Sequence, residues 1–224
     1  LGDNGPPLPR AKVTSYEAGV NVPFIAWGAP RVAPGQVSDA LVCTTDLMPT
    51  FLELAGAAAP AGLTGRSLLP LWQGRPAGWR DVLATEYTTH EPRDLNPQRS
   101  IRGARYKLTL TLLKDPAFRW PAAAGPFEEY RKIQRRAATG DFIELYDLKA
   151  DPYEYTNLAG SPEMKETQDR LARALQSWRE QTQDPLLDLA ALGELVVKEK
   201  DAKPTPAAAR NKARQAPGRP DARR

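Results

Sequence analysis

The chain has 224 residues, of which 41% are hydrophobic, and its formal net charge is +4. A chain of this length and apolar content can form one domain, or one and a half, around a packed core. Its longest apolar runs, such as residues 22–27, are far too short to span a bilayer, and the single cysteine, Cys43, excludes an internal disulfide.

The excess of positive charge belongs to the C-terminal end of the sequence. Residues 198–224 hold nine basic and three acidic side chains, which leaves a net charge of −2 on the rest of the chain. This stretch has no aromatic and no branched aliphatic residue, so it cannot bury enough apolar surface to offset the entropy of ordering. We predict a basic disordered tail over residues 186–224, which is either a solvated extension or a segment that contacts polyanions.

The first part of the chain has the pattern of a strand followed by a helix. The apolar run "VPFIAWGA" (22–29) predicts a buried strand. In "TTDLMPTFLELAGA", Thr44 or Thr45 can cap a helix that ends at Gly56. The apolar residues of this segment repeat at helical spacing: Leu47, Phe51, Leu54 and Ala55. A strand followed directly by a helix is typical of an α/β domain.

The second part changes to short alternating segments and one long helix. Four segments favour strands in an antiparallel meander: 81–87, 99–103, 106–113 and 142–148. A loop-rich stretch, 114–140, precedes the last of them. The long helix starts with Ser161 as its cap and Pro162 at the first helical position. Its apolar stripe consists of Met164, Leu171, Leu175 and Trp178. The sequence thus predicts an α/β piece over residues 1–78 and a small α+β subdomain over residues 79–185.

The string "DNG" places two side chains that carry oxygen, Asp3 and Asn4, between glycines. Such hard oxygen ligands suit Ca²⁺ or Mg²⁺ rather than zinc. Because His90 is the only histidine, a metal site based on histidines cannot be built from this sequence. Taken alone, the string is a weak signal and is more typical of a plain turn.

The wider context, "DNG…LPRAK…YEAGVNVPFIAWG", resembles the sulfatase family, the formylglycine-dependent branch of the alkaline phosphatase superfamily. Three further segments are similar to motifs of that family: "GQVSDALVCTTDLMPTFLELAG", "GRSLLPL" and "ELYDLKADPYEYTNLAGSP". Ala18 departs from the family pattern, which usually has glycine there. The likeness covers about residues 1–185. Within the family, "HEPRDLNPQRSIRGARYKL" and "WREQTQDP" are similar to the heparan N-sulfatase (sulfamidase) type and its bacterial relatives.

The resemblance implies roles for five residues. Asp3 and Asn4 would bind the active-site calcium, and Lys12 would contact the sulfate or the leaving oxygen. His90 and Glu91 would lie at the mouth of the pocket, against the substrate; the alternative for His90 is an ordinary histidine of a surface loop.

The nucleophile of the family is a hydrated formylglycine, made from Cys or Ser in a Cys/Ser-x-Pro/Ala-x-Arg motif that this sequence lacks. Cys43 is followed by neither the Pro/Ala nor the Arg, so we expect it to be a small residue in or near the core. We therefore expect the C-terminal portion of a sulfatase, inactive by itself, that acts on sulfate esters or N-sulfate groups of a sulfated small molecule or glycan.

Two alternatives remain open at this point. One is a phosphoesterase or phosphonate hydrolase of the same superfamily, which would share the logic of the metal site. The other is a non-catalytic module that binds polyanions through its basic tail. We expect no specific nucleic acid partner. Because members of the family are usually exported, the resemblance implies a periplasmic or secreted full-length protein.

Overall fold

The computed structural model describes residues 1–8, 10–28, 31–89, 95–112 and 143–201. Over these ranges no helix is both long enough and apolar enough to cross a membrane. The elements, in chain order, are α1 (Glu17–Val20), the 3-10 helix η1 (Thr44–Asp46), α2 (Leu47–Leu54), α3 (Leu69–Trp72), β1 (Leu83–Tyr87), β2 (Gln98–Arg102), β3 (Tyr106–Thr111), β4 (Ile143–Asp147), the 3-10 helix η2 (Pro162–Met164), α5 (Lys165–Gln181), the 3-10 helix η3 (Pro185–Leu187) and α6 (Leu189–Asp201).

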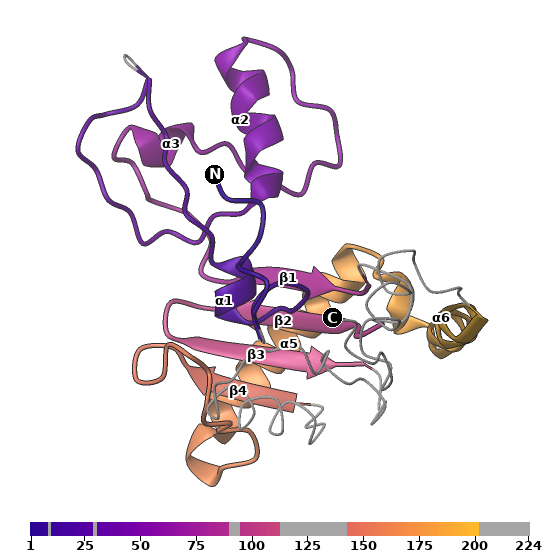
Figure 1. The fold of residues 1–224 in the computed structure, drawn as a ribbon. Helices are drawn as coiled ribbons and strands as arrows, with labels where there is room; N and C mark the ends of the chain where they lie inside the picture. Colours follow the sequence, from indigo (N-terminus) through magenta and orange to yellow (C-terminus); the bar gives the residue numbers. More distant parts are fainter. Residues whose placement is uncertain (9, 29–30, 90–94, 113–142, 202–224) are drawn as a thin grey trace, which may run out of the picture.

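The strands form one sheet in the order β1-β2-β3-β4, and every neighbouring pair is antiparallel. The predicted meander is therefore confirmed (Figure 1). The register aligns Ile101 of β2 with Leu108 of β3, and Leu108 with Leu145 of β4. Because successive side chains of a strand point to opposite faces, this row of apolar residues lies on one face of the sheet.

Helix α5 covers the apolar face. Its Leu171 and Leu175 are 0% and 2% exposed and join the three aligned strand residues in one core cluster. Met164 and Trp178 pack at the edge of this cluster, so the predicted apolar stripe of the long helix is confirmed. Burial of such residues is the main force that attaches the helix to the sheet.

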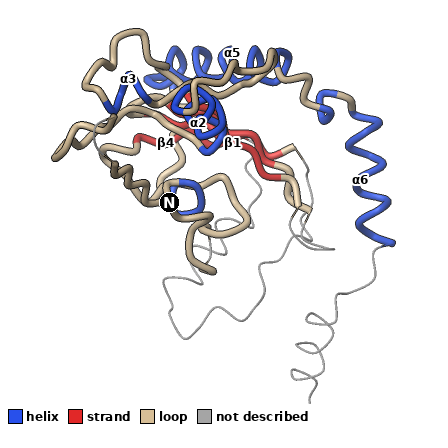
Figure 2. Tube along the Cα trace, turned by 90° about the horizontal axis from the view of Figure 1, so that it is seen from above, coloured by secondary structure: helices blue, strands red, loops and turns tan. Residues whose placement is uncertain are grey.

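The opposite face of the sheet is polar, yet it is also buried. Lys107 and Thr109 of β3 alternate with the apolar residues and are almost fully inaccessible to solvent. Residues 10–21, which include α1, lie across this face, on the side of the sheet that α5 does not occupy (Figures 1 and 2). The sheet is therefore enclosed between the N-terminal segment and α5.

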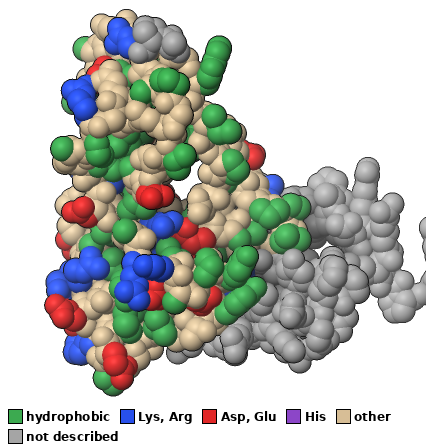
Figure 3. Space-filling view, turned by 90° about the vertical axis from the view of Figure 1, so that its left-hand side faces the viewer, with side chains coloured by type: hydrophobic (Ala, Val, Ile, Leu, Met, Phe, Trp, Pro, Cys, Tyr) green, Lys and Arg blue, Asp and Glu red, His purple; other side chains and the backbone are tan. Residues whose placement is uncertain are grey.

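Residues 22–80 form the upper part of the molecule in Figure 1, around α2 and α3. Their predicted strand at 22–29 is wrong: residues 21–28 form no strand, and Ile25 and Trp27 are 83% and 95% exposed. A strand needs a neighbour with which to form a ladder of hydrogen bonds. Among the described residues this segment accepts only two bonds from other parts of the backbone, from the Gly2 N–H at Pro23 O (3.0 Å) and from the Val32 N–H at Gly28 O (3.2 Å), and they form no ladder. Figure 3 shows hydrophobic side chains spread over the surface of this part.

Helix α2 is confirmed, but its predicted cap is wrong. Neither Thr44 nor Thr45 is the N-cap, because η1 precedes the helix: Cys43 is the N-cap of η1 and Asp46 that of α2. The apolar residues at helical spacing do not form a buried face in this chain, since Phe51 is 56% exposed. The helix ends as predicted at Gly56, which has φ +68°. Its neighbour Ala57 donates its N–H to Leu52 O (2.9 Å), the bond expected of a glycine-terminated helix.

The predicted disordered tail, 186–224, is wrong in its first part, where η3 and α6 are helical. The Asp188 carboxylate accepts the Ala190 N–H (2.8 Å) and so caps the start of α6. The prediction relied on the charge of the last residues and overlooked the apolar sequence "LAALGELVV" that follows this cap. Figure 2 shows α6 leading away from the sheet. Residues 202–224 and the loop-rich stretch 114–140 lie outside the described residues.

Truncation of Leu171 to Ala tests the core between α5 and the sheet. Because this side chain is fully buried, we expect Leu171→Ala to lower the free energy of unfolding by roughly 2–5 kcal/mol. Leu187→Ala, at a side chain that is 38% exposed, is the matched control and should change it much less. Urea unfolding followed by circular dichroism measures both variants. Equal losses would contradict the core assigned here.

Candidate functional site

Asp3 and Asn4 lie in an exposed turn. The Asn4 N–H donates to Asp3 Oδ1 (2.9 Å), and the Asn4 side-chain amide donates to Gly5 O (2.7 Å). The amide is thereby oriented with its oxygen away from Gly5. No other described residue bonds to that oxygen or to the second carboxylate oxygen of Asp3. The turn thus directs two side-chain oxygens toward solvent. This arrangement is compatible both with a cation site and with a plain turn.

The single helical turn α1, Glu17–Val20, supports this "DNG" string. The Gly5 N–H donates to Gly19 O (3.0 Å), and a Cβ at Gly5 would lie only 1.9 Å from Ala18 O. Glycine is therefore required at position 5 because two backbones meet there. The contact is made by the backbone of Ala18, whose side chain is exposed, so the departure from the family pattern at this position is tolerated.

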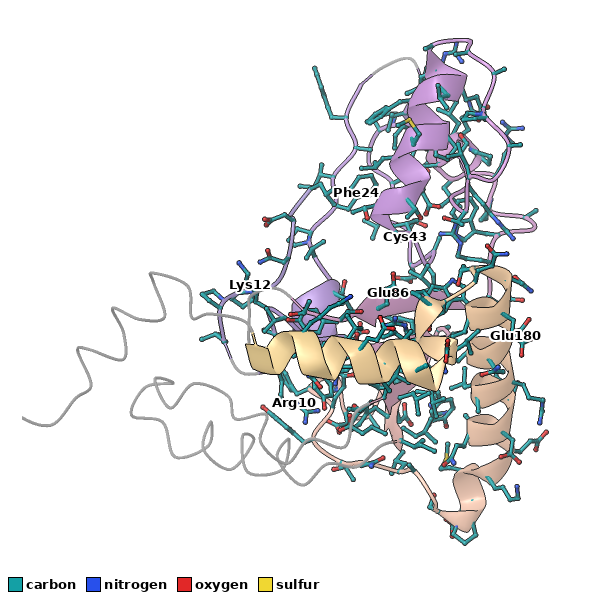
Figure 4. All side chains as sticks on the ribbon, turned by 90° about the vertical axis from the view of Figure 1, so that its right-hand side faces the viewer. Arg10, Lys12, Phe24, Cys43, Glu86 and Glu180 are labelled. Atoms are coloured by element: carbon teal, nitrogen blue, oxygen red, sulfur yellow. The ribbon has the colours of Figure 1, made fainter. Side chains whose placement is uncertain are left out.

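Lys12 is placed by the same turn. A Cβ at Gly19 would lie 2.2 Å from Ala11 O, so the backbone before Lys12 also rests on the turn. The Lys12 N–H donates to Pro6 O (3.1 Å). No described carboxylate pairs with its ammonium, and its side chain lies at the outer edge of the N-terminal segment (Figure 4). The turn thus holds three of the predicted site residues, Asp3, Asn4 and Lys12, on one support.

A buried cluster of charges attaches this turn to the sheet. The Lys107 ammonium lies 3.1 Å from Glu17 Oε1 and 3.1 Å from Glu154 Oε1. Glu154 Oε2 also accepts the backbone N–H of Glu17 (2.7 Å), and Arg102 pairs with the other oxygen of Glu17. Lys107 and Glu154 are 1% and 2% exposed. Charges are buried in this way only where close partners offset the loss of solvation.

Two opposing effects act on the pKa of Glu154 in this cluster. Burial raises the pKa of Glu154 above its ordinary value of 4.5, and the positive charge of Lys107 opposes that rise. The carboxylate therefore depends on its lysine to remain charged inside the protein.

The string "DLMPT" ties α2 to the segment that follows it. Both carboxylate oxygens of Asp46 lie 2.6 Å from the Arg80 guanidinium, and Asp46 also accepts the backbone N–H groups of Cys43 (2.9 Å) and Arg66 (2.8 Å). Burial alone would raise the pKa of this carboxyl, but these hydrogen bonds lower it below its ordinary value. Thr50 Oγ1 accepts the Leu68 N–H (2.8 Å). The motif is therefore a structural connection, and Cys43 is a half-buried part of it, as expected.

His90 and Glu91 lie outside the described residues, so their predicted place at the pocket mouth stays a prediction. Described residues near this gap in the chain are held by buried ion pairs. Arg99 donates to both oxygens of Asp184 (2.9 Å each) and to Tyr87 O (3.1 Å), at the end of β1. Arg179 donates to Asp184 Oδ2 (2.8 Å). The strings "RSIRG" and "WREQTQDP" therefore meet in one cluster of buried charges.

The donor set for a metal is incomplete within the described part of the chain. The described residues contain no group of three or more His, Cys, Asp or Glu side chains arranged to hold an ion. Asp3 and Asn4 provide hard oxygens at an exposed turn, which fit part of the coordination shell of Ca²⁺ but are fewer than the six or more that it takes.

Three comparisons with known proteins identify the family of this chain. Residues 11–118 match the family model described as N-sulphoglucosamine sulphohydrolase, C-terminal. An ulvan-active sulfatase of Formosa agariphila is 33% identical over 172 residues, which are 75% of this chain and 34% of that protein. The chain belongs to the sulfatase family. Human N-sulphoglucosamine sulphohydrolase is 29% identical, over 82% of this chain and 41% of its own length.

A solved structure of a 2-O GAG sulfatase superposes with a TM-score of 0.59 at 28% identity, over 77% of this chain and 32% of that one. The sulfatase chain described here thus spans about a third to two fifths of the length of these relatives and corresponds to their C-terminal region. The expected fold class, the C-terminal part of an alkaline-phosphatase-like α/β domain followed by an antiparallel sheet and helix, is confirmed.

Sequence reasoning missed the residues that support the site in this sulfatase segment, above all Lys107 and Glu154. The available signal was weak: a lysine within the alternating strand "YKLTLTLL" stands at a position that usually faces solvent. Only the structure shows that the N-terminal segment covers this position.

Removal of the central lysine tests the buried cluster of charges. We expect Lys107→Met to lower the free energy of unfolding by roughly 3–5 kcal/mol, because two buried carboxylates lose their partner. Lys165→Met, at an exposed lysine paired with Asp169, is the control and should have little effect. Chemical unfolding at several pH values measures both.

The defect of Lys107→Met should depend on pH in a defined direction. A carboxyl whose pKa is raised in the folded state favours folding when protonated, and this stability is lost as the pH rises through that pKa. Without the lysine the pKa of Glu154 should rise further, so the defect should be largest at neutral pH and shrink toward pH 4.5. A defect independent of pH would contradict the pairing.

Replacement of Asp184 by Asn tests the cluster that Arg99, Arg179 and Asp184 form. Burial alone would raise the pKa of Asp184, but hydrogen bonds from Arg99 and Arg179 lower it from 3.8 to about 2. Such a lowered pKa stabilises the fold above pH 3.8, by about 2 kcal/mol, and this contribution is lost as the pH falls toward 2. Asp184→Asn should lack this acid-dependent loss, whereas Asp169→Asn, on the exposed side of α5, should keep it. Acid titrations of unfolding decide between these outcomes.

Proposed function

We propose that this chain is the C-terminal portion of a sulfatase that hydrolyses sulfate esters or N-sulfate groups of a sulfated glycan. The observation that carries the proposal is that the backbone around Asp3, Asn4 and Lys12 rests on the single turn of α1, so that two side-chain oxygens and one ammonium belong to one supported segment. The names of relatives support a sulfated sugar as the substrate class: one is an N-sulphoglucosamine sulphohydrolase and another an N-acetylglucosamine-6-O-sulfatase.

In this proposal the Asp3 carboxylate and the Asn4 side-chain oxygen would hold a calcium ion together with ligands from other parts of the protein. A bound divalent cation would neutralise negative charge on the sulfate oxygens. Lys12 would donate hydrogen bonds to a sulfate oxygen or to the leaving oxygen, where charge develops during the reaction. His90 and Glu91 would contact the sugar.

The nucleophile of the proposed reaction is not among the residues of this sequence. It would be a formylglycine made from the Cys or Ser of the family motif, and Cys43 lies instead in the structural connection around Asp46. The exposed Ile25, Trp27 and Val37 support the proposal, because such a set of bare apolar side chains commonly marks a surface that further protein covers. We therefore propose that this chain alone does not turn over sulfate.

A phosphoesterase remains the second candidate, and one observation favours it. A multifunctional alkaline phosphatase superfamily protein of Trinickia caryophylli, PehA, is 33% identical over 65% of this chain. The two activities use the same kind of metal site and differ in the ester they accept. Relative kcat/KM values on an aryl sulfate, an N-sulfated hexosamine and an aryl phosphate would separate them.

The natural protein, isolated with whatever sequence precedes residue 1, provides the decisive test. We expect it to hydrolyse the sulfate compounds and to lose activity with a calcium chelator. Lys12→Met should lower kcat by roughly 100-fold, because the charge that develops on oxygen loses its cation. Lys149→Met, at an exposed lysine in the turn after β4, is the control and should leave kcat unchanged.

Three results of that assay would each contradict a different part of the proposal. A Lys12→Met enzyme with full activity would remove the role of Lys12. Preference for the phosphate would favour the second candidate. Sulfate turnover by residues 1–224 alone would show that the nucleophile lies within this chain.

A further inference from the structure

Two residues in the left-handed backbone region flank Lys12. Arg10 has φ +59° and Val13 has φ +66°, although neither is glycine. Such a conformation is uncommon for any residue with a Cβ and is an outlier for a β-branched residue such as valine. Strained positions of this kind persist only where the surrounding contacts determine them. Lys12 thus stands in a short loop that is forced into its shape from both ends.

The first end of the loop is held by the buried side chain of Arg10. Its guanidinium, 7% exposed, lies 3.8 Å from the centroid of the Tyr16 ring. It donates to Tyr146 Oη (3.3 Å) and to the backbone carbonyl of Glu154. Tyr146 lies in β4 and Glu154 in the loop that follows, so this anchor belongs to the C-terminal part of the chain. Figure 4 shows Arg10 below Lys12, against that part.

The residue that receives Arg10 has an uncommon backbone conformation of its own. Glu154 has φ +57°. In this conformation its carbonyl meets Arg10 while its carboxylate meets Lys107 and the N–H of Glu17. Glu154 therefore contacts both Arg10, in the loop before Lys12, and Glu17, at the start of α1.

The second end of the loop is held by local contacts. Thr14 Oγ1 donates to Ala11 O (2.8 Å), which closes a turn around Lys12. Ala11 and Thr14 are buried, and Gly19 packs against the carbonyl oxygens of both. Val13 itself is only partly buried, so its conformation is imposed by its neighbours.

We propose that Arg10 and Val13 are positioning residues for Lys12, and that Tyr146 and Glu154 act on Lys12 through Arg10. This inference rests on the proposed role of Lys12 in sulfate hydrolysis. The two left-handed positions restrict the backbone from which the ammonium projects, and the buried guanidinium maintains that restriction. Displacement of a catalytic group by about 1 Å can lower a rate by roughly 100-fold, so a loop fixed at both ends has a direct catalytic use.

A double-mutant cycle in the natural protein separates positioning from plain stability. Arg10→Met should lower kcat for an aryl sulfate by roughly tenfold or more, with a smaller change in KM, because a misplaced ammonium fails mainly in the transition state. In a protein that already carries Lys12→Met, the same change should lower kcat no further. Equal additional losses in both backgrounds would overturn the inference, since they would show a general structural effect. Arg10→Lys keeps the charge without the planar fork and should recover only part of the rate.

Val13→Gly is the second variant and decides the matter if Arg10→Met does not fold. Glycine adopts positive φ without strain, so the protein should keep its melting temperature and all of the side-chain anchors described above. The positioning role predicts a lower kcat nonetheless, because the loop gains freedom. An unchanged kcat in Val13→Gly, in an enzyme that Lys12→Met does impair, would overturn the inference and leave the proposed function intact. An unimpaired Lys12→Met enzyme would instead refute the proposed role of Lys12 itself.

Discussion

The arrangement of this protein depends on one buried lysine between two carboxylates. Lys107 belongs to β3, Glu17 to the N-terminal segment and Glu154 to the loop after β4, so the cluster joins three distant parts of the chain. Removal of these charges from water is favourable only when all of them are paired. The segment that carries the candidate site can therefore adopt its position only on a completed sheet, and an exposed turn acquires a fixed geometry from contacts that solvent does not reach.

The elements that could be predicted are those whose signal is local. The four strands and the long helix followed from alternation and helical spacing, because these patterns report which side chains share a face. The same patterns do not report what covers that face. Lys107 and Thr109 alternate with apolar residues as in a half-exposed strand, yet both are buried beneath residues 10–21. The run at 22–29 failed for a related reason, since a strand also requires a neighbour that pairs along its length, and the described residues form no ladder with it.

The candidate site was accessible from the sequence only through family resemblance, and only in part. Asp3, Asn4 and Lys12 follow from the order of motifs, and the structure places them on one support without testing their roles. The supports themselves have no local signature. Arg10 and Glu154 are 144 positions apart, and the left-handed conformations at Arg10 and Val13 occur in residues that rarely adopt them. Contacts of this range arise from the fold and cannot be inferred from neighbouring residues.

The motifs that identify the family are, in this region, mostly connections between segments. The Asp46 carboxylate of "DLMPT" receives two backbone N–H groups and an arginine. The Glu154 carboxylate of "DPYEY" meets a lysine and a backbone N–H, while its backbone carbonyl receives an arginine. A residue with several charged and polar partners from distant segments fits one arrangement of them, so each motif specifies a relative placement of chain segments rather than a reacting group. In the proposed reaction, the C-terminal part of this sulfatase would contribute by fixing where Lys12 projects.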